Sequence, residues 1–182
     1  QDLNGKIEMI IDGGPVGIGV ESTIVDVSGD VPAVLRPGAI TMEMLKDVLG
    51  EVTIDPAILG PMAAGVRPKA PGMKYKHYSP NAHVIIVKGD FDKFASLVAE
   101  PRSERTCAVC FDGEEDKISV PAYPYGHADS PEEQARELFD VLRHVDDEKM
   151  ELAFVRFPSL DGVGMAVYNR LLRAAGFEVI EL

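Results

Sequence analysis

Hydrophobic residues follow two different patterns along the chain, and the change falls near residue 80. In the first part, short alternating segments separated by glycine-rich turns predict strands at residues 6–11, 22–27, 31–35 and 51–54. The second and third of these are predicted to pair as a hairpin around the turn at residues 28–30. A short helix is predicted between Thr41, a suitable N-cap, and Gly50, a suitable end.

Beyond residue 80 the pattern predicts strands that alternate with helices. The strands are expected at residues 83–87, 106–111, 152–157 and 177–180, and the helices at 91–99, from 130 onward and at 163–175. Ser130, Pro131 and Glu133 carry the strongest helix start signal: an N-cap serine, a first-turn proline and a capping-box glutamate. This alternation predicts an α/β fold with a mostly parallel, doubly wound sheet between two helical layers.

Composition and charge narrow the class of protein. The 182 residues are 46% hydrophobic, as expected of a folded chain with a core, and the formal net charge is -12. With no apolar run long enough for a membrane span and no signal-like start, we expect a cytoplasmic location and no membrane partner. An acidic chain is a poor non-specific binder of nucleic acid, so a tRNA-binding protein is the least favoured functional class.

The two cysteines, Cys107 and Cys110, have a spacing that also occurs in zinc sites and redox pairs. Here they fall in a predicted strand, where a separation of three puts the side chains on opposite faces of the sheet. We therefore interpret both as small core residues in a reducing compartment, and we predict no metal site.

The segment from Lys69 to Pro80 combines cations with aromatic rings and has no regular hydrophobic period. No acidic residue occurs between Asp55 and Asp90, so the segment carries a local positive field that suits a phosphate-bearing ligand. Tyr75, His77 and Tyr78 offer ring faces on which a nucleobase could stack. The alternative interpretation is a solvated linker between two domains.

The glycine-rich stretch at residues 13–22 matches neither phosphate-binding fingerprint, because Ser22 replaces the third glycine and no Gly-Lys-Ser/Thr follows. A tight turn between strands is the favoured interpretation. Ser22 and Thr23 place two hydroxyl groups at the start of the next predicted strand, and hairpin pairing would bring Arg36 near Ser22. The planar guanidinium of Arg36 suits a phosphate or a carboxylate.

Taken together, several motifs resemble the longer, two-domain form of threonylcarbamoyl-AMP synthase, of the YrdC-like family. In chain order they are Asp12-Gly-Gly, Glu21-Ser-Thr-Ile-Val-Asp26, Leu35-Arg-Pro-Gly-Ala-Ile40, Pro71-Gly-Met-Lys-Tyr-Lys-His-Tyr-Ser-Pro80 and Gly126-His-Ala-Asp-Ser-Pro-Glu-Glu-Gln134. The resemblance implies a partial YrdC-like α/β sheet domain at residues 1–60, a linker or active-site lid at 61–80 and a small Rossmann-like parallel-sheet domain at 81–182.

The resemblance also implies an activity. Family members condense L-threonine, bicarbonate and ATP into threonylcarbamoyl-AMP and pyrophosphate, and other proteins transfer the product to tRNA. Mg2+ would come with ATP and not from a dedicated protein site, no catalytic side chain is expected, and tRNA would be only an indirect partner.

Individual residues follow from the motif matches. Ser22 would contact threonine, with Thr23 beside it. ATP or the adenylate would be bound by residues of two motifs, Arg36, His77, Tyr78, Tyr75 and Lys74.

In this family a long N-terminal portion of the YrdC-like domain carries a Lys-x-Arg and a Ser-x-Asn motif that hold the nucleotide, and the resemblance finds no counterpart of that portion in this chain. We therefore expect it to be the C-terminal part of the enzyme, completed by a missing N-terminal part of the same domain. The alternative hypothesis is a non-catalytic regulatory module whose α/β domain binds a ligand or a partner at the carboxyl ends of its strands.

Overall fold

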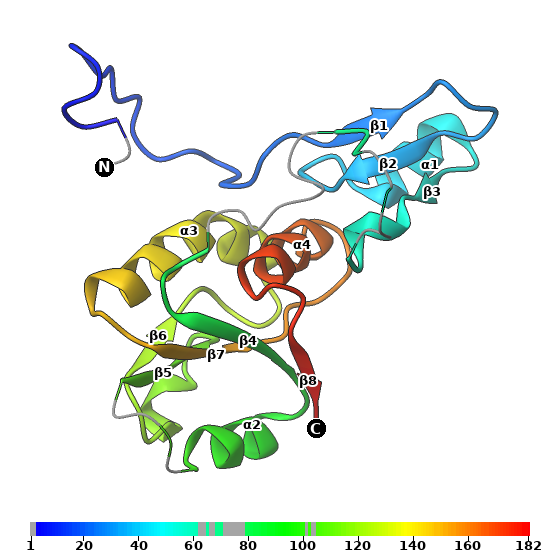
Figure 1. Cartoon of the computed structure of the whole chain (residues 1–182). Helices are drawn as coiled ribbons and strands as arrows, with labels where there is room; N and C mark the ends of the chain where they lie inside the picture. The colour runs from blue at the N-terminus through cyan, green and yellow to red at the C-terminus, as the bar shows by residue number, and fades with distance from the viewer. Residues whose placement is uncertain (1–2, 62–64, 66–67, 71–78, 101, 103–104) are drawn as a thin grey trace.

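The computed structural model of the chain describes residues 3–61, 65, 68–70, 79–100, 102 and 105–182. It contains two separate sheets, one of three strands and one of five. We call residues 19–61 the N-terminal unit and residues 79–182 the C-terminal unit. In Figure 1 the small sheet lies above the helices α3 and α4 that cover the larger sheet.

The N-terminal unit is built around a hairpin. Strands β1 (Ile24–Asp26) and β2 (Ala33–Arg36) pair in antiparallel fashion, and β3 (Thr53–Ile54) joins β2 in parallel. Helix α1 (Met42–Leu49) connects β2 to β3, and the short 3-10 helix η1 (Pro56–Ile58) follows. The predicted hairpin and helix are confirmed, and the Thr41 hydroxyl caps α1 by accepting a hydrogen bond from the backbone N–H of Met44 at 3.3 Å.

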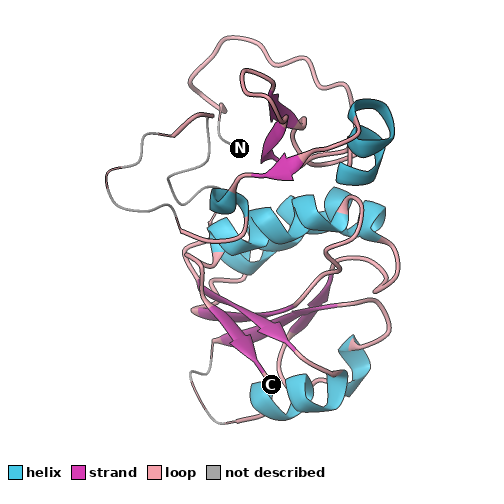
Figure 2. Cartoon of the chain, turned by 90° about the vertical axis from the view of Figure 1, so that its right-hand side faces the viewer, coloured by secondary structure: helices cyan, strands magenta, loops and turns pink. Residues whose placement is uncertain are grey.

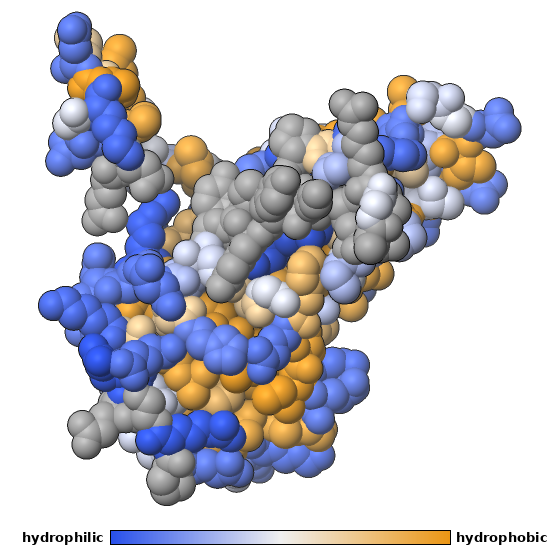
Figure 3. Space-filling model, viewed as in Figure 1, coloured by the Kyte–Doolittle hydropathy of each residue, from blue (hydrophilic) through white to orange (hydrophobic). Residues whose placement is uncertain are grey.

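The predicted strand at residues 6–11 is wrong. This segment has no strand pairing, and its apolar side chains are exposed, among them Met9 and Ile11. Figure 3 shows it standing apart from the rest of the molecule, with hydrophobic residues among hydrophilic ones. An alternating pattern specifies a strand only where a partner supplies backbone hydrogen bonds, and the described residues offer none here.

The C-terminal unit is a parallel sheet with the strand order β6-β5-β7-β4-β8. Its strands are β4 (His83–Lys88), β5 (Thr106–Cys110), β6 (Ala122–Pro124), β7 (Leu152–Arg156) and β8 (Val179–Glu181). Its helices are α2 (Phe91–Val98), the 3-10 helix η2 (Glu115–Lys117), α3 (Pro131–Asp147) and α4 (Gly164–Ala174).

The layers of this unit are those the alternation predicts. Helix α2 packs on one face of the sheet through Phe94 and Val98, and α3 and α4 cover the other face (Figure 2). Strand β6 was not predicted. Cys107 and Cys110 are fully buried in β5, which confirms that they are core residues. Burial raises the pKa of each thiol to about 12.

The start of α3 differs from the predicted capping box. Ser130 occupies the N-cap position, but its side chain makes no capping hydrogen bond. The Glu133 carboxylate instead accepts hydrogen bonds from the backbone N–H and ring Nδ1 of His127. The Glu133 carboxylate is thus bonded to His127 and not to the N-cap residue. Among the helices of the described residues, none has the length and apolarity that crossing a membrane requires.

Candidate functional site

Ser22 and Arg36, two residues singled out from the sequence, lie together at the open end of the β1–β2 hairpin. The Arg36 Nε donates to the backbone carbonyl of Ser22 at 2.9 Å, and its Nη2 donates to the Ser22 Oγ at 3.2 Å. The hairpin pairing places them so, because Ile24 lies opposite Arg36 in the register. The prediction that Arg36 approaches Ser22 is therefore confirmed.

The backbone of Gly38 holds this arrangement tightly. A Cβ at Gly38 would lie 2.4 Å from the carbonyl oxygen of Glu21 and 2.5 Å from the backbone nitrogen of Thr23. Only a residue without a side chain allows the chain after Arg36 to pass so close to the chain around Ser22. The Arg-Pro-Gly and Glu-Ser-Thr motifs thus form one packed structure, with the Ser22 side chain exposed at its surface.

Thr23 has a structural partner. Its hydroxyl donates to the backbone carbonyl of Ile40 at 2.8 Å, which ties the start of β1 to the loop before α1. This bond engages the one proton of the hydroxyl, so Thr23 can offer a ligand only its acceptor lone pairs. Ser22, whose oxygen accepts from Arg36, keeps its proton for a ligand.

The beginning of the basic segment also reaches this sheet. The Lys69 ammonium lies 3.1 Å from the Asp26 carboxylate, and Ala70 packs with Leu35 and Ala57. Hydrogen bonds from Ser28, followed by the contact with Lys69, lower the pKa of Asp26 to about 2. Four residues predicted to bind nucleotide, Lys74, Tyr75, His77 and Tyr78, lie outside the described residues.

Sequence reasoning missed a link between this site and the C-terminal unit. The Arg170 Nε on α4 donates to the Glu21 carboxylate at 2.5 Å, immediately before Ser22. Arg170 is buried, with 6% of its surface exposed. The Glu-Ser-Thr motif was visible in the sequence, but 149 residues separate the two partners, and no local pattern reports such a pairing.

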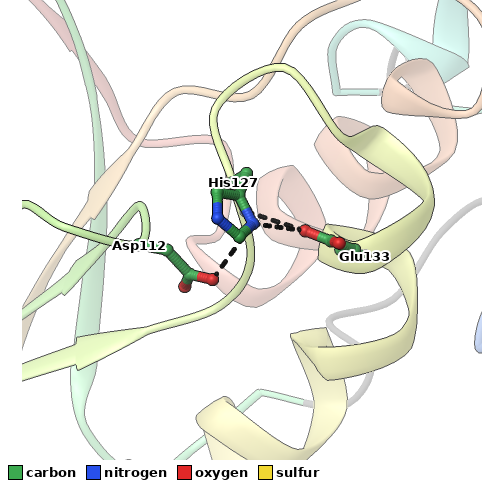
Figure 4. Close-up of side chains that lie close together, drawn as sticks. All are labelled: Asp112, His127 and Glu133. Atoms are coloured by element: carbon green, nitrogen blue, oxygen red, sulfur yellow. Dashed lines mark hydrogen bonds and ion pairs between the residues drawn. The ribbon is translucent and has the colours of Figure 1, made fainter.

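A second polar cluster lies in the C-terminal unit, away from Ser22. Asp112, His127 and Glu133 come from the loop after β5, the loop after β6 and the first turn of α3, and Figure 4 shows His127 between the two carboxylates. Its Nδ1 is 2.7 Å from Glu133 and 3.3 Å from Asp112. The hydrogen bond with Glu133, and then the charges of Glu133 and Asp112, raise the pKa of His127.

The donor atoms of this cluster all lie within 4.8 Å of one another, close enough to ligate one metal ion. They are already joined to one another and to the backbone, since Asp112 accepts from the Gly126 N–H and Glu133 accepts from the His127 N–H. These bonds hold the loop between β6 and α3. The absence of a metal site stays a prediction.

The carboxyl edge of the large sheet is where the alternative hypothesis placed a ligand. At the end of β7, this edge is occupied by one of the protein's own side chains. Arg156, at the end of β7, forms an ion pair with Glu114 at 3.1 Å and donates to the carbonyl of Gly89 at 2.8 Å. Its guanidinium also lies over the rings of Phe94 and Phe111.

The sequence of this chain matches a family model and several known proteins. The model of the family "threonylcarbamoyl-AMP synthase, C-terminal domain" matches residues 40–176. A threonylcarbamoyl-AMP synthase of Pyrococcus abyssi is 40% identical over 187 aligned residues, which cover 100% of this chain and 53% of the relative. One of Bacillus subtilis is 39% identical over 185 residues, covering 98% of this chain and 52% of the relative.

A solved structure agrees with these matches. The crystal structure of P. abyssi Sua5 complexed with L-threonine superimposes with a TM-score of 0.83 at 38% identity, over 98% of this chain and 52% of that one. The chain therefore spans about half the length of the relatives it matches.

Proposed function

Because the chain belongs to the threonylcarbamoyl-AMP synthase family, we propose that it carries the threonine-binding and part of the adenylate-binding site of an L-threonylcarbamoyladenylate synthase. The reaction joins L-threonine, bicarbonate and ATP into threonylcarbamoyl-AMP, with release of pyrophosphate and water. The product serves tRNA threonylcarbamoyladenosine formation through other proteins, so tRNA is an indirect partner. A cytoplasmic location is part of the same proposal.

The observation that carries the proposal is the contact between Arg36 and Ser22. The two bonds to Ser22 use two of the five N–H groups of the guanidinium, and the described residues engage none of the other three. A fixed cation with donors to spare, next to an exposed hydroxyl, can bind an anionic group while the hydroxyl contacts a small polar substrate. A relative with this fold is known in complex with L-threonine, which supports the same assignment.

In the proposed reaction the chain supplies position and charge, and no protein nucleophile is needed. The amine of threonine forms a carbamate with bicarbonate, and a carbamate oxygen attacks the α-phosphate of ATP while pyrophosphate leaves. Arg36 would neutralise charge on the phosphates or the adenylate. Ser22, with Thr23 beside it, would hold threonine in reach of this group.

Lys74, Tyr75, His77 and Tyr78 complete the proposed nucleotide site, and Mg2+ enters as part of the MgATP substrate. The proposed protein partner in the reaction is the N-terminal part of the same domain, as the family resemblance implies.

The first test is titration of the chain with L-threonine by calorimetry. Ser22→Ala should weaken binding by about 2- to 12-fold, the value of one neutral hydrogen bond. Arg36→Gln should weaken the binding of MgATP, titrated in the same way, by about 10-fold or more, because charge-assisted bonds are stronger. Ser96→Ala and Arg143→Gln are matched controls, because both side chains are exposed and bonded within their own helices.

The second test is pyrophosphate release that requires threonine, bicarbonate and ATP together. It compares the chain alone with the chain joined to the complete N-terminal portion of a relative. Activity of the joined protein that Arg36→Gln removes would support the proposal. Threonine binding that Ser22→Ala leaves unchanged, or MgATP binding that Arg36→Gln leaves unchanged, would refute the assignment of that residue.

A further inference from the structure

The segment that leads into Ser22 is packed against the helices of the C-terminal unit at three successive residues. Gly19 adopts a φ of +71°, and a Cβ there would lie 2.2 Å from the carbonyl oxygen of Ala135 on α3. Val20 packs against the main core of the C-terminal unit. Glu21 receives the Arg170 hydrogen bond from α4. The segment just before Ser22 thus contacts both helices, α3 through the backbone of Gly19 and α4 through the side chain of Glu21.

Helix α4 also binds the other side of the N-terminal unit. The Asn169 amide donates to the carbonyl of Ile58 at 2.7 Å, and Arg173 donates to the carbonyl of Ala57. Asn169 further accepts from Arg170 at 2.6 Å, which joins the two contacts into one network. Figures 1 and 2 both show α4 directly beneath the N-terminal unit.

The burial of these arginines is unusual for side chains whose only role is to cover a sheet. Arg170 and Arg173 are 6% and 4% exposed, and among the described residues the Nη2 of Arg170 and the Nε and Nη1 of Arg173 have no hydrogen-bond partner. Buried charge is costly unless it is paired, so the Glu21 carboxylate is important as the partner of Arg170. Burial, and then the charge of Arg170, lower the pKa of Arg173.

On its other side, the same segment is fixed by the N-terminal unit itself. Gly38 lies against the backbone of Glu21 and Thr23, and Arg36 binds both the carbonyl and the hydroxyl of Ser22. The Ser22 segment therefore lies between the Arg-Pro-Gly turn and helices α3 and α4. A shift of either support would move the hydroxyl relative to the guanidinium of Arg36.

We propose that Arg170 of α4 is a positioning residue for the substrate site, which acts through Glu21 to hold Ser22 in its binding geometry. Threonine binding and the docking of the two units are then coupled. This inference rests on the proposed function, because it takes the segment at Ser22 as the threonine site. The C-terminal unit would then stabilise the binding geometry of the threonine site.

The experiment uses Arg170→Gln, which removes the charge, and Glu21→Gln, a milder change that leaves α4 intact. Arg143→Gln, an exposed arginine of α3 bonded to Asp140 in its own helix, is the control. Two quantities are measured at a temperature where circular dichroism shows all variants folded. They are the L-threonine dissociation constant and the amide hydrogen exchange of residues 20–26.

We expect both Gln variants to speed exchange in residues 20–26 and to raise the threonine dissociation constant by about 5- to 150-fold, the usual range of coupling between sites. By reciprocity, saturating threonine should slow exchange around Ile58 in the wild type more than in Arg170→Gln. The double variant should cost less than the sum of the two single changes, because neither partner of the Glu21–Arg170 pair is then left charged without the other.

The outcomes separate the two proposals. If the wild type binds threonine and both Gln variants bind it equally well, Arg170 has no positioning role. Unchanged exchange at residues 20–26 would overturn that role as well. If the wild type does not bind threonine at all, the proposed function fails at its first step, and the positioning of a threonine site fails with it.

Discussion

Gly38→Ala tests how closely the Arg-Pro-Gly turn supports the segment around Ser22. The new Cβ would lie 2.4 Å from the Glu21 carbonyl oxygen and 2.5 Å from the Thr23 nitrogen, and both are backbone atoms that no rotamer change can move away. Forcing an extra methyl group into a well-packed place costs about 1–3 kcal/mol. This cost destabilises the β1–β2 hairpin, because the turn at Gly38 after β2 must move away from residues 21–23 before β1.

The assay is native-state hydrogen exchange of the backbone amides in β1 and β2. A loss of about 1–3 kcal/mol in the opening free energy corresponds to exchange about 5- to 150-fold faster. Gly29→Ala is the control, because it lies in the turn of the same hairpin and its nearest neighbour is 3.9 Å away. Exchange in Gly38→Ala within twofold of the control variant would refute the argument that this close approach supports the site.

Three further predictions concern the C-terminal unit. Phe154→Ala, in the centre of the sheet and fully buried, should lower the free energy of unfolding by about 3–5 kcal/mol in urea denaturation, against at most about 0.5 kcal/mol for the exposed Val48→Ala. The pKa of His127 is raised above its usual 6.5. Protonated His127 therefore stabilises the folded protein fully below pH 6.5, and this stabilisation is lost as pH rises through the raised pKa. In thermal melts from pH 5 to 9, the melting temperature of the wild type should therefore exceed that of His127→Ala at low pH, and the difference should shrink as pH rises. Cys107 and Cys110, whose pKa values burial raises to about 12, should resist iodoacetamide at pH 8 until urea unfolds the protein, and rapid labelling of the folded chain would contradict this.

The sequence predicted those parts of the fold that local signals determine. Helices α1, α3 and α4 have a helical hydrophobic period, strands β4, β5 and β7 are short apolar runs, and a cap or turn residue marks most of their ends. Strand β6 was missed because Ala122-Tyr-Pro124 is too short to alternate and contains a proline. Proline is tolerated at a sheet edge, which is where β6 lies.

In the candidate site, the sequence predicted only the contacts that follow from motifs and from the register of the hairpin. Register brings Arg36 to Ser22 because both flank one turn. The bond between Glu21 and Arg170 depends on how two units pack, and nothing in the neighbourhood of either residue specifies it. The strand expected at residues 6–11 failed for a related reason, because a local pattern does not supply the partner strand.

Two surfaces of the C-terminal unit, the carboxyl edge of its sheet and the outer face of α4, differ in what their polar side chains contact. At the carboxyl edge of the sheet, where α/β proteins usually bind ligands, Arg156 is paired with Glu114 and only 12% of its side chain is exposed. On the outer face of α4, polar side chains reach away from the sheet and are nevertheless buried, because the N-terminal unit lies against them. A helix that had only to cover the sheet would leave its outer polar groups in water, because burying polar groups costs free energy. The placement of Asn169, Arg170 and Arg173 therefore argues that the outer face of α4 is the docking surface of the N-terminal unit, as the proposed positioning of Ser22 through Glu21 requires.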